Sequence, residues 1–430
     1  MFSDNSIRQL LAFGLAAVVL IVLTYPTSPV LFQILVFDHI IAFLILCGVG
    51  FPLALLLKNR KIRFRYKLHV SGSLLTSSLV VLTLIACFLI TGNPTAIRDL
   101  MSLLLIGCVI YMLKNKAYIK FYRLLIRFTA LLVLLSLPGV VMFALSPESF
   151  DIWRAANLDI KPDNPLLSRE KWADFDYAMY FYTSVIPVDW SSDSQRYPLF
   201  FTEPTYYGAY VIAPLFLAVY DARSGRDWLV VAILFIGFLL SYSILVLLLV
   251  LASLMIGYLA INLRLGSPKL LFLLFMLAPL GLLVFPSIFF FLLDLLPGDK
   301  IAEFEFFLLR GAFSLPAEVS LFGTPAQERV LSIDAIEAYG ATVLFTRYGL
   351  VGTFAFVLFL LMYVYRSFNF LYTPQIKKSK RLIGFTALFC CTCMAIKIPQ
   401  FLLLSSILTY HYLICTSAQR SSTKPFKPAV

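Results

Sequence analysis

Residues 228–262 read WLVVAILFIGFLLSYSILVLLLVLASLMIGYLAIN, a run of 35 positions without a charged side chain. One helix of this length would measure about 52 Å, whereas the hydrocarbon core of a bilayer is about 30 Å thick. The run is therefore too long for one ordinary crossing. Ser241-Tyr242-Ser243 places two serine hydroxyls near its middle. We therefore expect two membrane helices, 228–241 and 243–262, joined as a hairpin.

The rest of the chain has the same character. Of its 430 residues, 60% are hydrophobic and 13% are charged, whereas a soluble domain averages about 45–50% apolar and about 25% charged residues. This composition excludes a disordered chain, and the unbroken apolar runs exclude the alternating strands of a membrane barrel. The predicted fold class is all-α, a polytopic integral membrane bundle of about twelve transmembrane helices. The predicted helices lie near 8–25, 38–57, 69–90, 97–113, 124–145, 204–220, 228–241, 243–262, 270–295, 340–364, 382–397 and 399–416.

Basic loops orient this bundle. Residues 58–67 contain six Lys and Arg residues, 114–127 contain five and 366–381 contain five. Lys and Arg concentrate in cytoplasmic loops of membrane proteins, so all three segments are predicted to be cytoplasmic. The number of crossings between the second and third segments must then be even, which the hairpin in 228–262 satisfies. Both termini are predicted to be cytoplasmic. The net charge of +12 is thereby explained by topology, and no nucleic-acid partner is expected.

Two long polar segments fall on the outer side, and long ordered loops on a scaffold usually carry function. They divide the chain into five parts. The predicted parts are an N-terminal five-helix region (1–145), a first outer loop (146–203), central helices (204–296), a second outer loop (297–339), and three C-terminal helices with a tail (340–430). The seven Cys residues lie in apolar runs and the three His residues are scattered. No metal, cofactor or disulfide framework is therefore expected.

Aromatic residues are concentrated in the first outer loop, which holds Trp153, Trp172 and Trp190. One interpretation is an interfacial belt, because Trp favours the headgroup level of a membrane. The other is a platform for sugar rings, whose apolar faces pack on aromatic planes. Both interpretations remain open at this point.

The first outer loop ends in Arg196-Tyr-Pro-Leu-Phe-Phe-Thr-Glu203-Pro204. Pro204 suits the first turn of a helix, where a missing N–H costs nothing. An arginine beside the positive end of a helix is a good site for a phosphate or diphosphate. The alternative is a structural pair between Arg196 and Glu203 at the helix cap.

Three further arginines belong to the second outer loop and the helix after it: Arg310, Arg329 and Arg347. Arg347 falls inside the predicted helix, and a cation there is costly unless it lines a polar cavity. Together with Arg196, these guanidinium groups are predicted to converge on one anionic ligand. The alternative is four separate contacts with headgroups or carboxylates.

The stretch Arg196…Phe-Thr-Glu203-Pro204-Thr-Tyr-Tyr-Gly208 at the head of a helix resembles the O-antigen polymerase and O-antigen ligase superfamily of membrane glycosyltransferases. The serine-bearing break at Leu239–Ser243 and the Gly-rich helix Tyr348-Gly-Leu-Val-Gly352 resemble the same family. The resemblance covers roughly residues 190–365. It implies a GT-C-like helical bundle with an outer cavity and a metal-independent transferase that uses undecaprenyl-diphosphate-linked sugars.

Under this resemblance, Arg196 and Arg329 would hold the diphosphate, and Glu203 or Glu337 would accept the proton of the acceptor hydroxyl. The implied catalytic residues are Glu203, Glu337 and Arg329. The implied substrate-binding residues are Arg196, Tyr206, Arg310, Arg347 and Trp190.

The ligases of this superfamily carry a functional His in the second outer loop, and residues 297–340 contain none. This absence favours a polymerase that joins repeat units at the outer face of the bacterial inner membrane. The alternatives are an O-antigen ligase and a lipid-linked oligosaccharide flippase, although predicted membrane runs almost free of charge disfavour translocation. The expected partners are the lipid-linked oligosaccharide, membrane lipids, a chain-length regulator and a flippase.

Overall fold

The structure, a computed structural model, describes most of the central and C-terminal helices. The described residues are 72–92, 115–145, 178–180, 183–187, 195–199, 204–241, 244–262, 321–323, 341–372, 376–397 and 402–421, with scattered positions before residue 115. The helices predicted near 8–25, 38–57, 97–113 and 270–295 lie wholly or mostly outside these residues.

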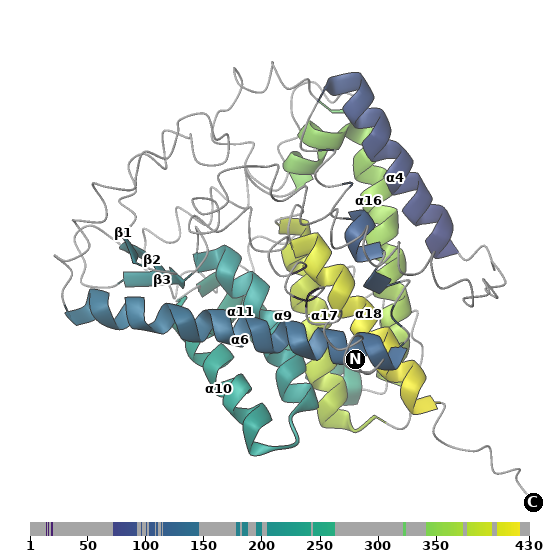
Figure 1. The fold of residues 1–430 in the computed structure, drawn as a ribbon. Helices are drawn as coiled ribbons and strands as arrows, with labels where there is room; N and C mark the ends of the chain where they lie inside the picture. The colour runs from purple at the N-terminus through teal and green to yellow at the C-terminus, as the bar shows by residue number, and fades with distance from the viewer. Residues whose placement is uncertain are drawn as a thin grey trace, which may run out of the picture.

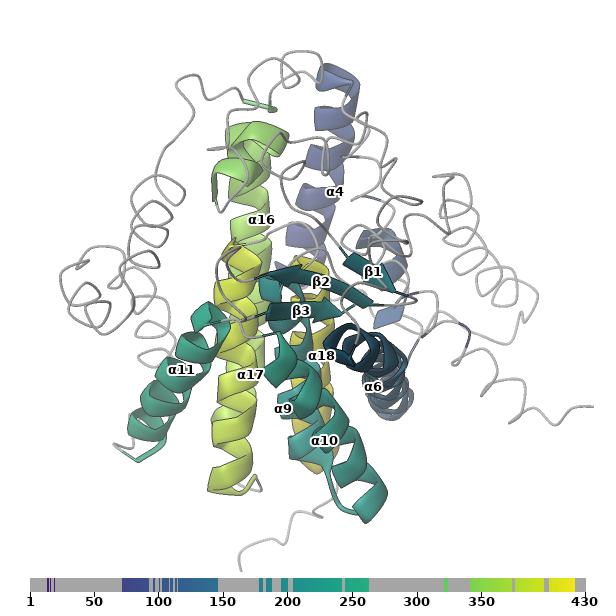
Figure 2. The ribbon, with the colours of Figure 1, turned by 90° about the vertical axis from the view of Figure 1, so that its left-hand side faces the viewer.

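Helices dominate the described part of the chain, as predicted (Figure 1). They are α4 (Gly72–Thr91), α6 (Asn115–Leu145), α9 (Pro204–Asp221), α10 (Gly225–Leu240), α11 (Ile244–Asn262), α16 (Ala341–Tyr372), α17 (Lys378–Lys397) and α18 (Leu402–Ser421). Two of them contain stretches long and apolar enough to cross a membrane, Asn115–Met142 and Tyr348–Phe368. Helix α6 lies at a steep angle to α16, α17 and α18 (Figures 1 and 2).

The long apolar run is broken where the sequence predicts it. Helix α10 ends at Leu240 and α11 begins at Ile244. At the end of α10, the Ser241 hydroxyl donates a 2.7 Å hydrogen bond to the Phe238 carbonyl, and the Ser241 N–H donates to the Gly237 carbonyl at 3.2 Å. The serine thus satisfies a carbonyl group that the end of the helix would otherwise leave without a partner.

Contacts at the far ends of α10 and α11 show that the two helices form a hairpin. Gly257, near the end of α11, packs on Phe385 in the first turns of α17. Lys380, in the first turn of α17, donates a hydrogen bond to the carbonyl of Tyr220 in the last turn of α9, and a short turn joins α9 to the start of α10. The start of α10 and the end of α11 therefore lie at the same end of the bundle. Figure 2 shows the two arms diverging, α10 beside α9 and α11 beside α17.

A small antiparallel sheet adds strands to a fold that the sequence predicts as purely helical. Strands β1 (Ala178–Tyr180), β2 (Thr183–Pro187) and β3 (Gln195–Leu199) pair in the order β1-β2-β3. Two residues join β1 to β2, a length typical of a β-hairpin. Strand β3 contains Pro198 and lies at the edge of the sheet, where a missing N–H is tolerated. The sheet contacts α6, α9 and α10.

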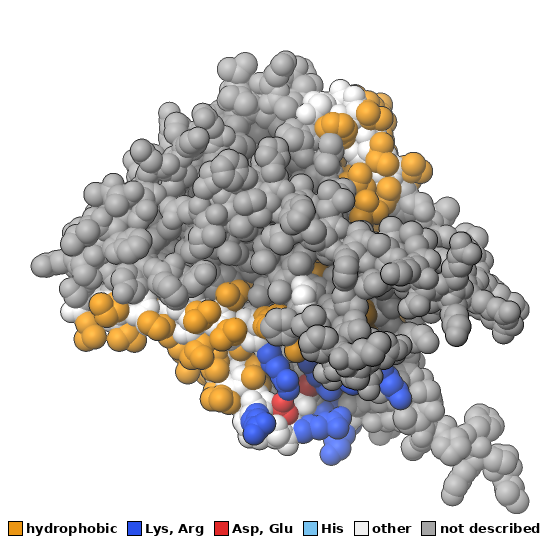
Figure 3. All heavy atoms as spheres, in the orientation of Figure 1, with side chains coloured by type: hydrophobic (Ala, Val, Ile, Leu, Met, Phe, Trp, Pro, Cys, Tyr) orange, Lys and Arg blue, Asp and Glu red, His pale blue; other side chains and the backbone are white. Residues whose placement is uncertain are grey.

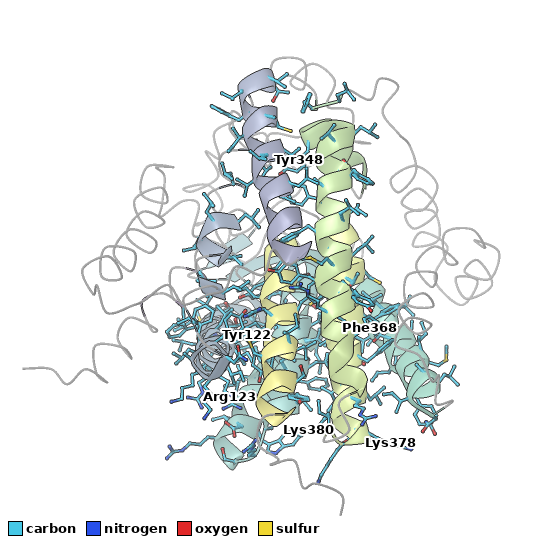
Figure 4. The ribbon with its side chains drawn as sticks, turned by 90° about the vertical axis from the view of Figure 1, so that its right-hand side faces the viewer. Tyr122, Arg123, Tyr348, Phe368, Lys378 and Lys380 are labelled. Carbon is cyan, nitrogen blue, oxygen red and sulfur yellow. The ribbon has the colours of Figure 1, made fainter. Side chains whose placement is uncertain are left out.

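Basic side chains gather at one end of the described helices, which we call the basic end (Figures 3 and 4). It comprises Lys116, Lys120, Arg123, Arg127, Arg223, Arg226, Arg366, Lys377, Lys378, Lys380 and Arg381. These residues come from the second and third segments that the sequence predicts to be cytoplasmic and from the turn between α9 and α10. Basic residues from segments far apart in the sequence therefore lie at the same end of the bundle.

Candidate functional site

Three of the predicted site residues lie on described backbone, and their side chains lie outside the description. Arg196 is in β3, where it pairs with Ile186 of β2. Tyr206 is in the first turn of α9, and Arg347 is in the second turn of α16. The other predicted site residues, Trp190, Glu203, Arg310, Arg329 and Glu337, lie outside the described residues. Their convergence on one ligand remains a prediction.

The head of α9 follows directly from β3 and is held by buried tyrosines. The helix begins at Pro204, as its sequence predicts. The Tyr207 side chain is fully buried against Gly237 of α10, where a β-carbon would collide with its ring hydroxyl. One turn later, the Tyr210 hydroxyl lies 3.1 Å from the Thr129 hydroxyl of α6. The strand that carries Arg196 therefore leads into a helix start packed against two neighbours.

The head of α16 contains a kink that sequence reasoning did not predict. Gly349 has φ +65° and ψ −167°, a conformation that residues with a β-carbon rarely adopt. A β-carbon at this position would also collide with the backbone of Leu321 and Gly323. Beyond the kink, the Val351 N–H donates a 3.1 Å hydrogen bond to the Leu321 carbonyl. The short segment 321–323 of the second outer loop is thus fixed on the head of α16.

Two side chains satisfy the backbone around this kink. The Cys87 thiol of α4 lies 3.5 Å from the Tyr348 carbonyl and donates to it. The Thr353 hydroxyl donates a 2.8 Å hydrogen bond to the Gly349 carbonyl. A kink interrupts the regular helical ladder, so these bonds offset the backbone pairing that it loses. Arg347 precedes the kink by two residues.

A second polar centre lies at the basic end and was also missed from the sequence. The Asp221 carboxylate accepts a 2.8 Å hydrogen bond from Arg123 Nε and another from the Tyr412 hydroxyl. This triad joins the end of α9 to α6 and α18. The sequence did contain a signal for this triad. Asp221 ends an otherwise apolar helix, and a partly buried carboxylate needs a hydrogen-bonding or charged partner. Because its two partners come from two other helices, this carboxylate ties three helices together.

In the described part of the chain, no three His, Cys, Asp or Glu side chains form a group that could hold a metal ion. The metal independence expected from the sequence stays a prediction. Comparison of the chain with models of known protein families, with curated proteins and with solved structures finds no match.

Proposed function

We propose that this protein is a polysaccharide polymerase of the bacterial inner membrane. It would transfer an undecaprenyl-diphosphate-linked glycan to an acceptor repeat unit at the outer face. The observation that carries the proposal is that the two long loops join the bundle at the N-terminal ends of α9 and α16. Strand β3, with Arg196, leads toward the start of α9, and the segment 321–323 contacts α16 at Gly349 and Val351, shortly after Arg347 in the sequence.

The N-terminal ends of α9 and α16 both lie away from the basic end. Helix α9 finishes at Asp221, beside Arg123. Helix α16 finishes beside the start of α17, where the rings of Phe368 and Phe385 are 6.4 Å apart. In Figure 4, Tyr348 accordingly lies at the opposite end of α16 from Phe368 and Lys378. If the basic end is cytoplasmic, the two outer loops share the outer face, where a lipid diphosphate donor is presented.

The proposed step is a glycosyl transfer. An acceptor hydroxyl attacks the anomeric carbon of the donor, and the bond from that carbon to the diphosphate oxygen breaks. The departing undecaprenyl diphosphate gains negative charge, which Arg196 and Arg329 would stabilise. The hydroxyl proton passes to a carboxylate, for which Glu203 and Glu337 are the candidates. Tyr206 and Trp190 would orient the sugars, and Arg310 and Arg347 would bind the anionic headgroup.

The test is the glycan profile of cells that carry Arg196→Ala or Arg329→Ala as the only copy of the protein. Removal of a preorganised donor to a developing negative charge lowers rates by roughly 100- to 1,000-fold. We therefore expect single repeat units on the final acceptor, with normal amounts of membrane-inserted protein. Arg366→Ala is the matched control, since Arg366 lies near the other end of α16 and should leave long glycan chains intact.

Other profiles would contradict the proposal. Full-length glycan in either loop variant would remove that arginine from the mechanism. Finished polymer that accumulates on the carrier lipid in a deletion strain would indicate a ligase instead. Repeat units retained on the cytoplasmic side would indicate a flippase.

A further inference from the structure

One exposed stripe of α6 changes from basic to apolar partway along the helix. Lys116, Lys120 and Arg127 are exposed in its first half. The same stripe continues with Leu131 and then Leu134, at spacings of four and three residues that keep side chains on one face of a helix. Leu131 is 48% exposed, so this apolar stretch is not covered by the described part of the protein.

Helix α10 shows the same change. Arg226 is exposed at its start, and Trp228 follows at 54% exposure. The exposed face then continues with Leu229, Phe235, Ile236 and Leu239. Helices α6 and α10 pack against each other and cross at an angle (Figure 1). Arg127 lies near Asp227 at one end of their contact, and Val133 lies against Gly237 further along both helices. Figure 3 shows hydrophobic side chains over both helices on one face, with Lys and Arg side chains at the lower edge of this patch.

The change from basic to apolar occurs at the same level on both helices. Arg127 Nη2 lies 3.9 Å from Asp227 Oδ1 at this level, and the Arg127 side chain is 61% exposed. A pair this long and this exposed contributes little stability, so Arg127 retains most of its capacity to bind another anion. The other carboxylate oxygen of Asp227 is used by the cap of α10, where the Ser224 hydroxyl and the backbone N–H groups of Ser224 and Arg223 donate to it. These bonds hold the pKa of Asp227 below its usual value, the Ser224 hydroxyl contributing most.

Positive charge exceeds negative charge at the basic end. Eleven Lys and Arg side chains stand there against two carboxylates, Asp221 and Asp227, which are the only acidic residues in the described part of the chain. Asp221 is already bound by Arg123 and Tyr412. The described groups at this end therefore do not neutralise one another, and an anionic partner would complement them.

We propose that the α6–α10 surface binds an anionic phospholipid of the leaflet at the basic end. Its phosphate would lie beside Arg127, Arg223 and Arg226, and its acyl chains would lie along the apolar stripes of α6 and α10. A lipid fits both halves of the surface, because only a partner that is anionic at one end and apolar beyond it matches the shared boundary. Trp228 follows Arg226 at the boundary, so it would lie at the headgroup level of this lipid, which Trp favours in membrane proteins. The inference does not depend on the transferase chemistry.

The test uses the full-length protein in detergent, offered equal amounts of phosphatidylglycerol and phosphatidylcholine with identical acyl chains. Native mass spectrometry counts the lipid of each kind that the protein retains. We expect retention of phosphatidylglycerol over phosphatidylcholine. Loss of one guanidinium near an anionic headgroup should weaken binding roughly fivefold, so R127Q/R226Q should weaken it roughly 25-fold. The charge-retaining R127K/R226K should preserve most of the preference.

The matched control is K377Q/K378Q, which removes the same number of charges from the start of α17 and should bind phosphatidylglycerol as the unaltered protein does. If the control lost as much phosphatidylglycerol binding as R127Q/R226Q, the attraction would be diffuse and not localised at the α6–α10 surface, which would overturn the proposal. Equal retention of both lipids would overturn it as well. Displacement of phosphatidylglycerol by millimolar inorganic phosphate would identify a free-anion site instead. If R127Q/R226Q does not fold, the single variants R127Q and R226Q carry the test, each with a roughly fivefold loss expected.

Discussion

At the residue scale, Gly349 is a position at which segment 321–323 meets α16. Its φ of +65° and ψ of −167° cost a residue with a β-carbon about 1–3 kcal/mol, and an added carbon against the backbone of Leu321 and Gly323 costs about 1–3 kcal/mol more. We expect Gly349→Ala to lower the free energy of unfolding by about 2–6 kcal/mol, measured by thermal unfolding in detergent.

Gly92→Ala separates these two contributions. Gly92 has φ +63°, but a β-carbon there would meet nothing within 4 Å. This control should therefore show only the backbone cost. Equal losses in the two variants would mean that the contact with segment 321–323 contributes nothing to stability.

Tyr412 supports a second prediction at this scale. Its hydroxyl donates to the Asp221 carboxylate, and Asp221 is only 15% exposed. A hydrogen bond to a charged group contributes about 1.5–3 kcal/mol. We expect Tyr412→Phe to destabilise the protein by about 1.5 kcal/mol, the lower value, because Arg123 remains as a second donor. Thermal unfolding measures this loss, and Tyr258→Phe on the exposed face of α11 is the control that should change nothing.

At the scale of elements, the break between α10 and α11 bears on the predicted topology. Two crossings and one crossing would put the segments after Asn262 on opposite sides of a membrane. The start of α10 and the end of α11 lie at the basic end, so the turn at Ser241 lies away from it. A reporter fused after Ser241 should therefore be active on the outer side. Fusions after Arg226 and after Lys378 should both report the cytoplasm. A cytoplasmic signal after Ser241 would show that 228–262 is one crossing and would reverse the predicted side of every segment after it.

At the scale of the whole molecule, the proposed chemistry relies on guanidinium groups to stabilise the leaving diphosphate. Polymerisation by the purified protein should therefore survive EDTA with its rate unchanged. A rate that falls with EDTA and returns with a divalent ion would contradict the metal-independent mechanism. A transferase known to require Mg²⁺, assayed in parallel, shows that chelation is complete.

The amino-acid sequence alone decides the helical character of the chain, the break at Ser241 and the gathering of basic residues at one end. Each depends on local properties, namely the length of an apolar run, a polar interruption within it, and charges flanking it. The sequence also indicates the candidate site residues, but their meeting depends on how two loops fold over the bundle, and that remains a prediction.

Other features were decided only by the tertiary structure. The contact between Gly323 and Gly349, and the triad of Arg123, Asp221 and Tyr412, join residues far apart in the sequence. The strands of the first outer loop are short, and they contact α6, α9 and α10. Such contacts form because packed helices bring particular small or polar groups together. Hydropathy and charge along the chain carry no information about which groups will meet.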